Sequence, residues 1–301
     1  MTGRRFKFLL DATTGALAVG LLNVIKRLDR KRTADFAGWL MRKIGPLLKE
    51  HGIGRDNLRA AFPEKSDAEI TRILGGVWDN LGRISVEFAH LADFHVAGFG
   101  PPHPDDIPFP EASLERYHRI LKSGRARIAF AAHLANWELF AVVVKQLGVE
   151  SAVLYRRPNI RAISDLVIKL REPLMGQMIP AGLDAPLKLA RLLQSGINVG
   201  MLADQHYTRG VEVMFFGRPC MVNPLPALLA RQTGCPIHGV RSVRLPDGNS
   251  FGGEVTEEVE PARDAQGQID IKGTMQAITS VIESWVREHP EQWLWVHRRW
   301  R

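Results

Sequence analysis

The sequence is poor in cysteine: its 301 residues include only Cys220 and Cys235. These two form neither a Cys-x-x-Cys pair nor a disulfide framework, so we expect no structural zinc and no chemistry that depends on a thiol. The chain also lacks a phosphate-binding P-loop, a dinucleotide glycine fingerprint and a His-Glu-x-x-His zinc helix. We therefore predict that the protein uses no nucleotide, metal or other cofactor.

Long hydrophobic runs are also missing. The most apolar stretch, residues 8–25, contains Asp11, and its uncharged part is shorter than the ~20 residues that a membrane-spanning helix prefers. Leu17 and Leu21 share one face of a helix there, and basic residues flank both ends. The sequence therefore predicts a membrane anchor or interfacial helix at residues 1–30. This helix either spans the bilayer at a tilt or lies on its surface. An ordinary packing helix is the third possibility.

No secretory cleavage site follows this stretch before a basic cluster at residues 26–32, so we expect the segment to be retained. If it spans, the denser positive charge after it predicts that the main domain, residues 31–301, faces the cytoplasm. The formal net charge of +8 calls for a polyanionic neighbour, which could be nucleic acid, an anionic membrane surface or a phosphorylated substrate. The basic and aromatic residues 293–301 suit a membrane interface and nucleic acid equally.

A hydrophobic content of 45% is enough for a sizeable core. Ser66 and Glu69 form a capping box, and the apolar stripe that follows predicts a long helix. From residue 113 onward, helical and strand patterns alternate, which favours an α/β fold with a mostly parallel central sheet flanked by helices. The predicted strands are 128–132, 152–155, 198–202, 211–216, 236–245 and 251–255, and the predicted helices are 113–122, 137–145, 160–171, 186–194 and 274–288.

His133 and Glu138 follow the first of these strands directly. A turn between them, with Asn136 as the cap of the next helix, would let the carboxylate fold back to the imidazole and stabilise its protonated form. The pair then forms a general-base dyad at the carboxyl end of a strand, where open α/β sheets bind ligands. The alternative is a core or capping histidine beside an ordinary helix carboxylate.

No Gly-x-Ser-x-Gly nucleophile elbow is present, so the base would activate a hydroxyl of the substrate. Arg156 and Asp204 follow two further strands and would lie at the same crevice. Arg156 suits a phosphate or an oxyanion, and Asp204 would orient an arginine or a substrate hydroxyl. A solvated arginine and a capping aspartate are the alternatives. Residues 215–226 could line an apolar acyl channel or belong to the core.

Several motifs in order resemble one family, the late acyltransferases of lipid A biosynthesis (the lauroyl/myristoyl acyltransferases of the lysophospholipid acyltransferase superfamily). The motifs are Asn57-Leu-Arg-Ala-Ala-Phe-Pro63, Trp78-Asp-Asn-Leu-Gly-Arg83, His133-Leu-Ala-Asn-Trp-Glu138, Asp204-Gln205 followed by Phe215-Phe216-Gly217, and Pro290-Glu-Gln-Trp-Leu-Trp-Val-His-Arg-Arg299. The resemblance implies a glycerolipid-acyltransferase-like fold and an acyl-ACP-dependent O-acyltransferase of the bacterial inner membrane, with its catalytic domain facing the cytoplasm. Its partners would be acyl carrier protein as donor, a phosphorylated lipid A precursor as acceptor and the membrane, without nucleic acid.

In that resemblance, His133 and Glu138 match the catalytic pair, and Arg156 and Asp204 match charged substrate-binding positions. Residues 218–224 differ from the threonine-rich form of many members, which leaves the acyl-chain length and the acceptor hydroxyl open. Transfer to another membrane glycolipid or a lysophospholipid is an alternative within the superfamily. A non-catalytic, basic protein that binds a membrane surface or nucleic acid is the alternative from another class.

Overall fold

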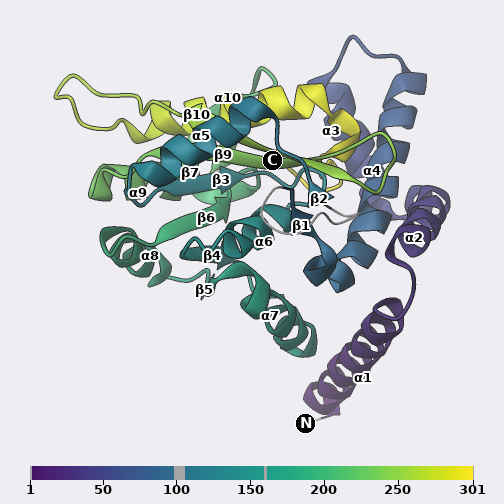
Figure 1. The fold of residues 1–301 in the computed structure, drawn as a ribbon. Coiled ribbons are helices and arrows are strands. Elements are labelled where there is room, and N and C mark those ends of the chain that lie inside the picture. The colour runs from purple at the N-terminus through teal and green to yellow at the C-terminus, as the bar shows by residue number, and fades with distance from the viewer. Residues whose placement is uncertain (1, 98–105, 159–160, 301) are drawn as a thin grey trace.

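The computed structural model describes residues 2–97, 106–158 and 161–300, and Figure 1 shows their arrangement. Its helices are α1 (Thr2–Ile25), α2 (Arg30–Ile44), α3 (Lys49–Ala61), α4 (Asp67–Glu87), α5 (Glu111–Lys122), α6 (Leu139–Gln146), α7 (Arg161–Met175), α8 (Ala185–Gln194), α9 (Leu225–Thr233) and α10 (Ile271–Glu288), with short 3₁₀ turns η1 (Gly45–Leu47), η2 (Phe88–Asp93) and η3 (Pro290–Gln292). Its strands are β1 (His95–Val96), β2 (Asp106–Ile107), β3 (Ile128–Ala131), β4 (Ser151–Tyr155), β5 (Gln177–Pro180), β6 (Asn198–Leu202), β7 (His206–Phe215), β8 (Arg218–Val222), β9 (Ile237–Arg244) and β10 (Phe251–Glu258).

A six-stranded sheet with the order β10-β9-β3-β6-β4-β5 forms the centre of the fold. The five strands from β9 to β5 run parallel, and β10 pairs antiparallel with β9 at the edge. Asp247 and Gly248 form the tight connection between those last two strands, and Gly248 has a positive φ of 76°. The predicted α/β fold with a mostly parallel sheet is confirmed.

The order of the strands places the predicted site residues together. The chain leaves β3, forms β4 and β5, and returns so that β6 lies between β3 and β4. His133 follows β3 and Asp204 follows β6, so the two residues come from paired strands. The carboxyl ends of parallel strands open onto a ligand-binding crevice in such sheets.

The two faces of the sheet differ in packing. Along β3, Ile128 and Phe130 are fully buried in the main hydrophobic cluster, together with side chains of α8, α9 and α10. Ala129 and Ala131 point to the opposite face, toward α6, as the alternation of a strand requires. A second apolar cluster lies on that side, built from α6, η2 and Met175 at the end of α7.

Helix α4 begins as its sequence predicts. The Ser66 hydroxyl accepts the backbone N–H of Glu69, and the Glu69 carboxylate accepts the backbone N–H of Ser66, which completes the capping box. Gly82 lets α4 approach α2 closely: a Cβ atom there would lie 2.4 Å from the carbonyl oxygen of Ala37. The buried face of α4 packs on the main cluster through Ile70, Ile73, Leu74, Val77 and Trp78.

The N-terminal segment forms the single helix α1, which contacts α7 and extends from the body of the molecule (Figure 1). In the part of the chain that the structure describes, no helix is long and apolar enough to cross a membrane. The prediction of a spanning helix is therefore not supported, because polar residues such as Thr13, Thr14 and Asn23 interrupt the apolar stretch. The division into residues 1–30 and 31–301 stays a prediction.

Candidate active site

The loop between β3 and α6 carries His133 and passes through a strained residue. Ala135 has a positive φ of 46°, a conformation that disfavours residues other than glycine. Its N–H donates to the carbonyl oxygen of Gln292 at 2.9 Å, and its own carbonyl oxygen accepts the Asn80 amide at 3.3 Å. The loop is thus fixed from two sides, by α4 and by the segment after α10.

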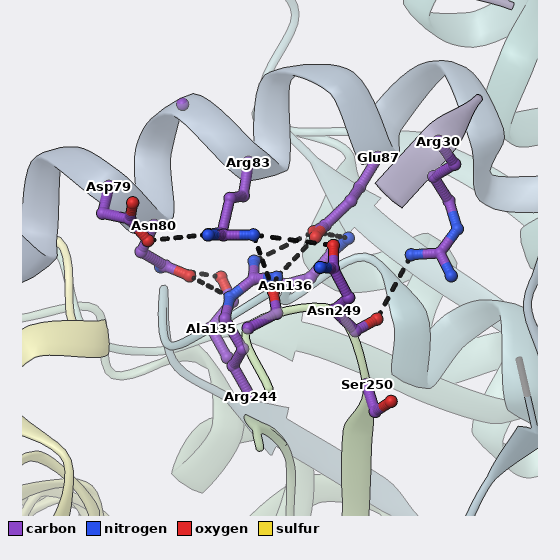
Figure 2. Close-up of polar contacts among 12 residues, drawn as sticks. Arg30, Asp79, Asn80, Arg83, Glu87, Ala135, Asn136, Arg244, Asn249 and Ser250 are labelled. Carbon is purple, nitrogen blue, oxygen red and sulfur yellow. Dashed lines mark hydrogen bonds and ion pairs between the residues drawn. The ribbon is translucent and has the colours of Figure 1, made fainter. Parts of the chain in front are cut away.

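A buried polar network supports this loop on the side that faces α4, as Figure 2 shows. Glu87 of α4 is fully buried and pairs with the Arg244 guanidinium. The same carboxylate accepts the side-chain amide of Asn136 at 3.0 Å. Arg244 also donates to the amide oxygen of Asn80 at 2.9 Å. A buried ion pair is costly unless its remaining hydrogen-bonding capacity is used, and these contacts use it.

His133 makes its closest polar contacts with Asp204. The imidazole Nδ1 lies 2.8 Å from Oδ1 of Asp204, and the backbone N–H of His133 donates to Oδ2 at 2.8 Å. The indole N–H of Trp293 donates to the same Oδ2, also at 2.8 Å. Asp204 is only 1% exposed, so these donors replace the water that its carboxylate would otherwise bind.

Asp204 stays ionised despite its burial. Burial alone raises the pKa of Asp204, but the charge of His133 and the hydrogen bonds that His133 donates hold this pKa well below its ordinary value. An ionised carboxylate only accepts hydrogen bonds, so Nδ1 of His133 carries the proton. In the neutral ring, Nε2 is then the free acceptor, and the Gln205 amide nitrogen lies 3.3 Å from it.

Glu138 forms no hydrogen bond or ion pair with His133, which corrects the predicted dyad geometry. Among the described residues, its carboxylate pairs with the Arg171 guanidinium through both oxygens and accepts the Trp137 indole N–H. The reason is competition: Asp204 already holds Nδ1 of His133, and Arg171 offers a permanent charge in a planar fork that matches a carboxylate. Helix α6 also begins at Leu139 rather than at residue 137.

His133 and Glu138 nevertheless line one cavity of about 920 Å³. Arg156 and Arg171 also line it, whereas Asp204 lies buried behind His133. Arg156 is exposed and forms no hydrogen bond or ion pair within the described part of the chain. Most of the remaining lining is apolar and comes from the sheet, α5, α6 and α7, including Phe140, Val144, Val153, Met175 and Met178.

Of the predicted acyl channel at residues 215–226, only Asn223 lines this cavity. Phe215 and Phe216 are buried in the main core, where they pack against Trp293 and Trp295. The alternative, that these aromatic side chains belong to the core, is therefore the correct one.

No cluster of three or more His, Cys, Asp or Glu side chains that could hold a metal ion occurs in the described ranges.

Comparison with known proteins shows which family the chain belongs to. The family model described as bacterial lipid A biosynthesis acyltransferase matches residues 4–301. The chain belongs to this acyltransferase family. It is 25% identical to a phosphatidylinositol mannoside acyltransferase of Mycolicibacterium smegmatis over 291 residues, which cover 88% of this chain and 89% of the relative. It is also 24% identical to a lipid A biosynthesis palmitoleoyltransferase of Escherichia coli over 260 residues, which cover 85% and 80% of the two chains.

For this acyltransferase, sequence reasoning missed three residues of the site. Arg171 pairs with Glu138, Trp293 binds Asp204, and Asn80 holds the loop at Ala135. Asn80 and Trp293 stand in motifs that carried the family resemblance, so the sequence marked them without giving their roles. Arg171 had no such signal, because nothing in a helical pattern shows which strand end an arginine will reach.

Proposed function

We propose that this protein transfers a fatty acyl group from acyl carrier protein to a hydroxyl of a phosphorylated glycolipid, with a lipid A precursor as the first candidate acceptor. Membership of an acyltransferase family supports the reaction class. One observation carries the site assignment: His133 is held by a buried carboxylate through Nδ1 and lines a large, mostly apolar cavity. A cavity of this size is typical of a site that encloses most of a small-molecule ligand.

The proposed chemistry needs a single base. Nε2 of His133 takes the proton of the acceptor hydroxyl as its oxygen attacks the thioester carbonyl. The new C–O bond forms, the C–S bond breaks, and His133 returns the proton to the leaving thiolate. Asp204 stabilises the positive imidazole that exists between these two proton transfers. No covalent enzyme intermediate is required.

Two arginines divide the remaining roles in the proposal. Arg171 holds Glu138 at the cavity wall, so this ion pair shapes the site beside His133. Arg156 is exposed at the carboxyl end of β4 and has no described partner, so its guanidinium is free to bind a phosphate of the acceptor or the oxyanion. Backbone N–H groups are the alternative donors to the oxyanion.

A phosphorylated mannolipid is the second candidate acceptor. The relative from Mycolicibacterium smegmatis that covers 88% of this chain is named for phosphatidylinositol mannoside. Both acceptors combine sugar hydroxyls with phosphate and acyl chains, and a His–Asp pair abstracts a proton from either.

We also propose that the protein works at the bacterial inner membrane with its site on the cytoplasmic side. Leu17, Leu21 and Val24 of α1 are largely exposed, and Phe36 and Trp39 of α2 are also exposed. Basic residues accompany them in the 26–32 cluster, which would favour an anionic lipid surface. This arrangement supports a helix lying on the membrane.

The test uses the full chain in vesicles containing anionic lipid. Acyl carrier protein loaded with a fatty acid is supplied with either a lipid A precursor or phosphatidylinositol mannoside, and mass spectrometry identifies the product. We expect an acylated glycolipid that disappears with His133→Ala while the protein stays folded. Equal release of free fatty acid without any acceptor would indicate a thioesterase instead. Unchanged activity of the variant would refute the proposed base.

A further inference from the structure

The floor of the cavity consists of three rows of residues that cross the sheet. The row near His133 contains Ala131 and Leu202, which are paired across β3 and β6. The middle row contains Ala129, Gly200 and Val153, which are aligned across three neighbouring strands. These side chains point away from the main core, because the alternate residues of each strand face α8 and α9.

Gly200 leaves the middle of this floor open. A Cβ atom added there would meet no heavy atom within 4 Å, and the glycine lines the cavity. Its φ lies outside the left-handed region that favours glycine, so the backbone does not require this residue. Glycine weakens a strand, so its presence in the centre of a sheet indicates that something else approaches the backbone.

A row of polar residues forms the end of the cavity that lies farthest from His133. Asn198 and Ser151 are paired there across β6 and β4, and the Asn198 amide oxygen accepts the backbone N–H of Arg127 at 3.2 Å. The Arg127 guanidinium donates to the carbonyl oxygens of Ile120 and Arg125, which fixes its position. All three polar residues of the row line the cavity.

We propose that Gly200 and Arg127 determine which acyl-chain lengths the site accepts, Gly200 by leaving the middle row open and Arg127 by ending the cavity. This inference rests on the proposed acyl transfer. An extended hydrocarbon chain would enter beside His133, pass over Gly200 and end against Arg127. Apolar residues of α5, α6 and α7 would cover it.

The length of the cavity floor determines how many bonds of an acyl chain fit along it. Arg127 and Ala131, the floor residue next to His133, are four residues apart, which corresponds to about 13 Å along a strand at ~3.3 Å per residue. An extended backbone advances by about 1.2 Å per bond, so this length accommodates roughly 11 bonds of a similar zigzag chain. Gly200 lies in the middle row, two residues before the far row, so a blockage there removes roughly six bonds.

The experiment compares Gly200→Val and Arg127→Ala with the unchanged protein, using acyl carrier thioesters of graded even chain length. Gly252→Val is the matched control, because Gly252 also lies in a strand with room for a Cβ atom but does not line the cavity. We expect Gly200→Val to lose long donors and keep short ones. Each pair of methylenes that the cavity excludes should weaken binding by about tenfold, so the loss grows with the length of the donor. Arg127→Ala should accept longer donors, and Gly252→Val should keep the original profile.

Displacement of a fluorescent fatty acid by free fatty acids of the same lengths provides a second measurement. It reports the depth of the cavity without any transfer reaction. If no donor is transferred by the unchanged protein but the binding profile still shortens in Gly200→Val, the proposed function fails and the depth assignment holds. An identical binding profile in Gly200→Val and the unchanged protein would overturn the inference, whatever the transfer assay shows. If Arg127→Ala does not fold, the comparison of Gly200→Val with the unchanged protein still tests the inference.

Discussion

The guanidinium of Arg171 holds both carboxylate oxygens of Glu138. Glu138 has no hydrogen bond or ion pair with His133, which pairs with Asp204 instead. The site therefore contains a His–Asp pair and a separate Arg–Glu ion pair rather than one His–Glu dyad. Each pair joins residues that are far apart in sequence, and both lie on the same side of the sheet.

Removal of Arg171 should destabilise the protein. Arg171→Ala leaves the buried Glu138 carboxylate without its cation, which typically costs about 3–5 kcal/mol. The double variant with Glu138→Gln should recover most of this loss, because no unpaired charge remains. Urea unfolding measures both, and Arg156→Ala, at an exposed position, should stay within about 0.5 kcal/mol of the original. A stable Arg171→Ala single variant would show that the ion pair does not matter for folding.

Asp204→Asn should abolish most of the proposed turnover. The neutral amide cannot stabilise a positive imidazole. Its NH₂ group can also donate to Nδ1, which favours the tautomer with the proton on Nε2. We therefore expect kcat to fall about 10²–10⁴-fold. Asp56→Asn, at an exposed aspartate, is the control and should retain full activity. Steady-state kinetics at neutral pH distinguishes the two. Retention of kcat in Asp204→Asn would argue against a role for this carboxylate.

Acid should destabilise the fold in two steps. Burial lowers the pKa of His297 and of His238 below the ordinary value, so both imidazoles favour the neutral form in the folded state. Their contribution to stability is complete above about pH 6.5 and is lost as the pH falls through the folded pKa. The pKa of Asp204 is lowered too, so its contribution is complete above about pH 4 and is lost below that.

Urea unfolding across this pH range measures both steps. His297→Asn keeps a side-chain donor for the carbonyl oxygen of Leu294 and should reduce the first loss. Asp204→Asn should reduce the second. If the free energy of unfolding stayed constant down to about pH 4, the predicted contribution of His297 and His238 would be wrong.

Asn80 should affect catalysis as well as stability. Asn80→Ala removes the donor to the carbonyl oxygens of Ala135 and Gln292, and we expect a loss of about 1–3 kcal/mol. Because the loop positions His133, kcat should fall while KM changes little. Gln146→Ala is a suitable comparison. It removes a similar hydrogen bond, from the side-chain amide of Gln146 to the carbonyl oxygen of Phe94, at a place away from His133. Its kcat should be unchanged, and an equal fall in both variants would mean that Asn80 acts only on stability.

Two glycines of α4 should respond to alanine in opposite directions. Gly75 has open space around an added Cβ atom, so Gly75→Ala should stabilise the helix by about 0.5–1 kcal/mol. At Gly82 the added atom meets the Ala37 carbonyl oxygen, so Gly82→Ala should destabilise the protein and loosen α2. Thermal unfolding compares them directly. A stabilised Gly82→Ala variant would contradict the close approach of the two helices.

Much of the fold could be predicted because its signals are local. The capping box at Ser66 and the alternation of helices with strands each depend on a few neighbouring residues. The elements that were not predicted include β5, which is short and contains Pro180 at the sheet edge, and α9, whose first turn contains Pro226 and follows Pro224. Proline is common in the first turn of a helix, but a proline-rich run also indicates a loop.

The candidate site was predictable only in part. The positions of His133 and Asp204 at strand ends followed from the sequence. Their contact depends on β6 lying beside β3, which is a tertiary property. The partner of Glu138 lies 33 residues away on α7, and no periodicity indicates that distance.

Trp293 ties the last part of the printed sequence to the carboxylate behind His133. A ribosome produces β3 and β6 well before it reaches this tryptophan, so the nascent chain has its histidine and aspartate without the indole that fixes them. We therefore expect the carboxylate of Asp204 to reach its final hydrogen bonding only after Trp293 has been added, later than the strands of the sheet.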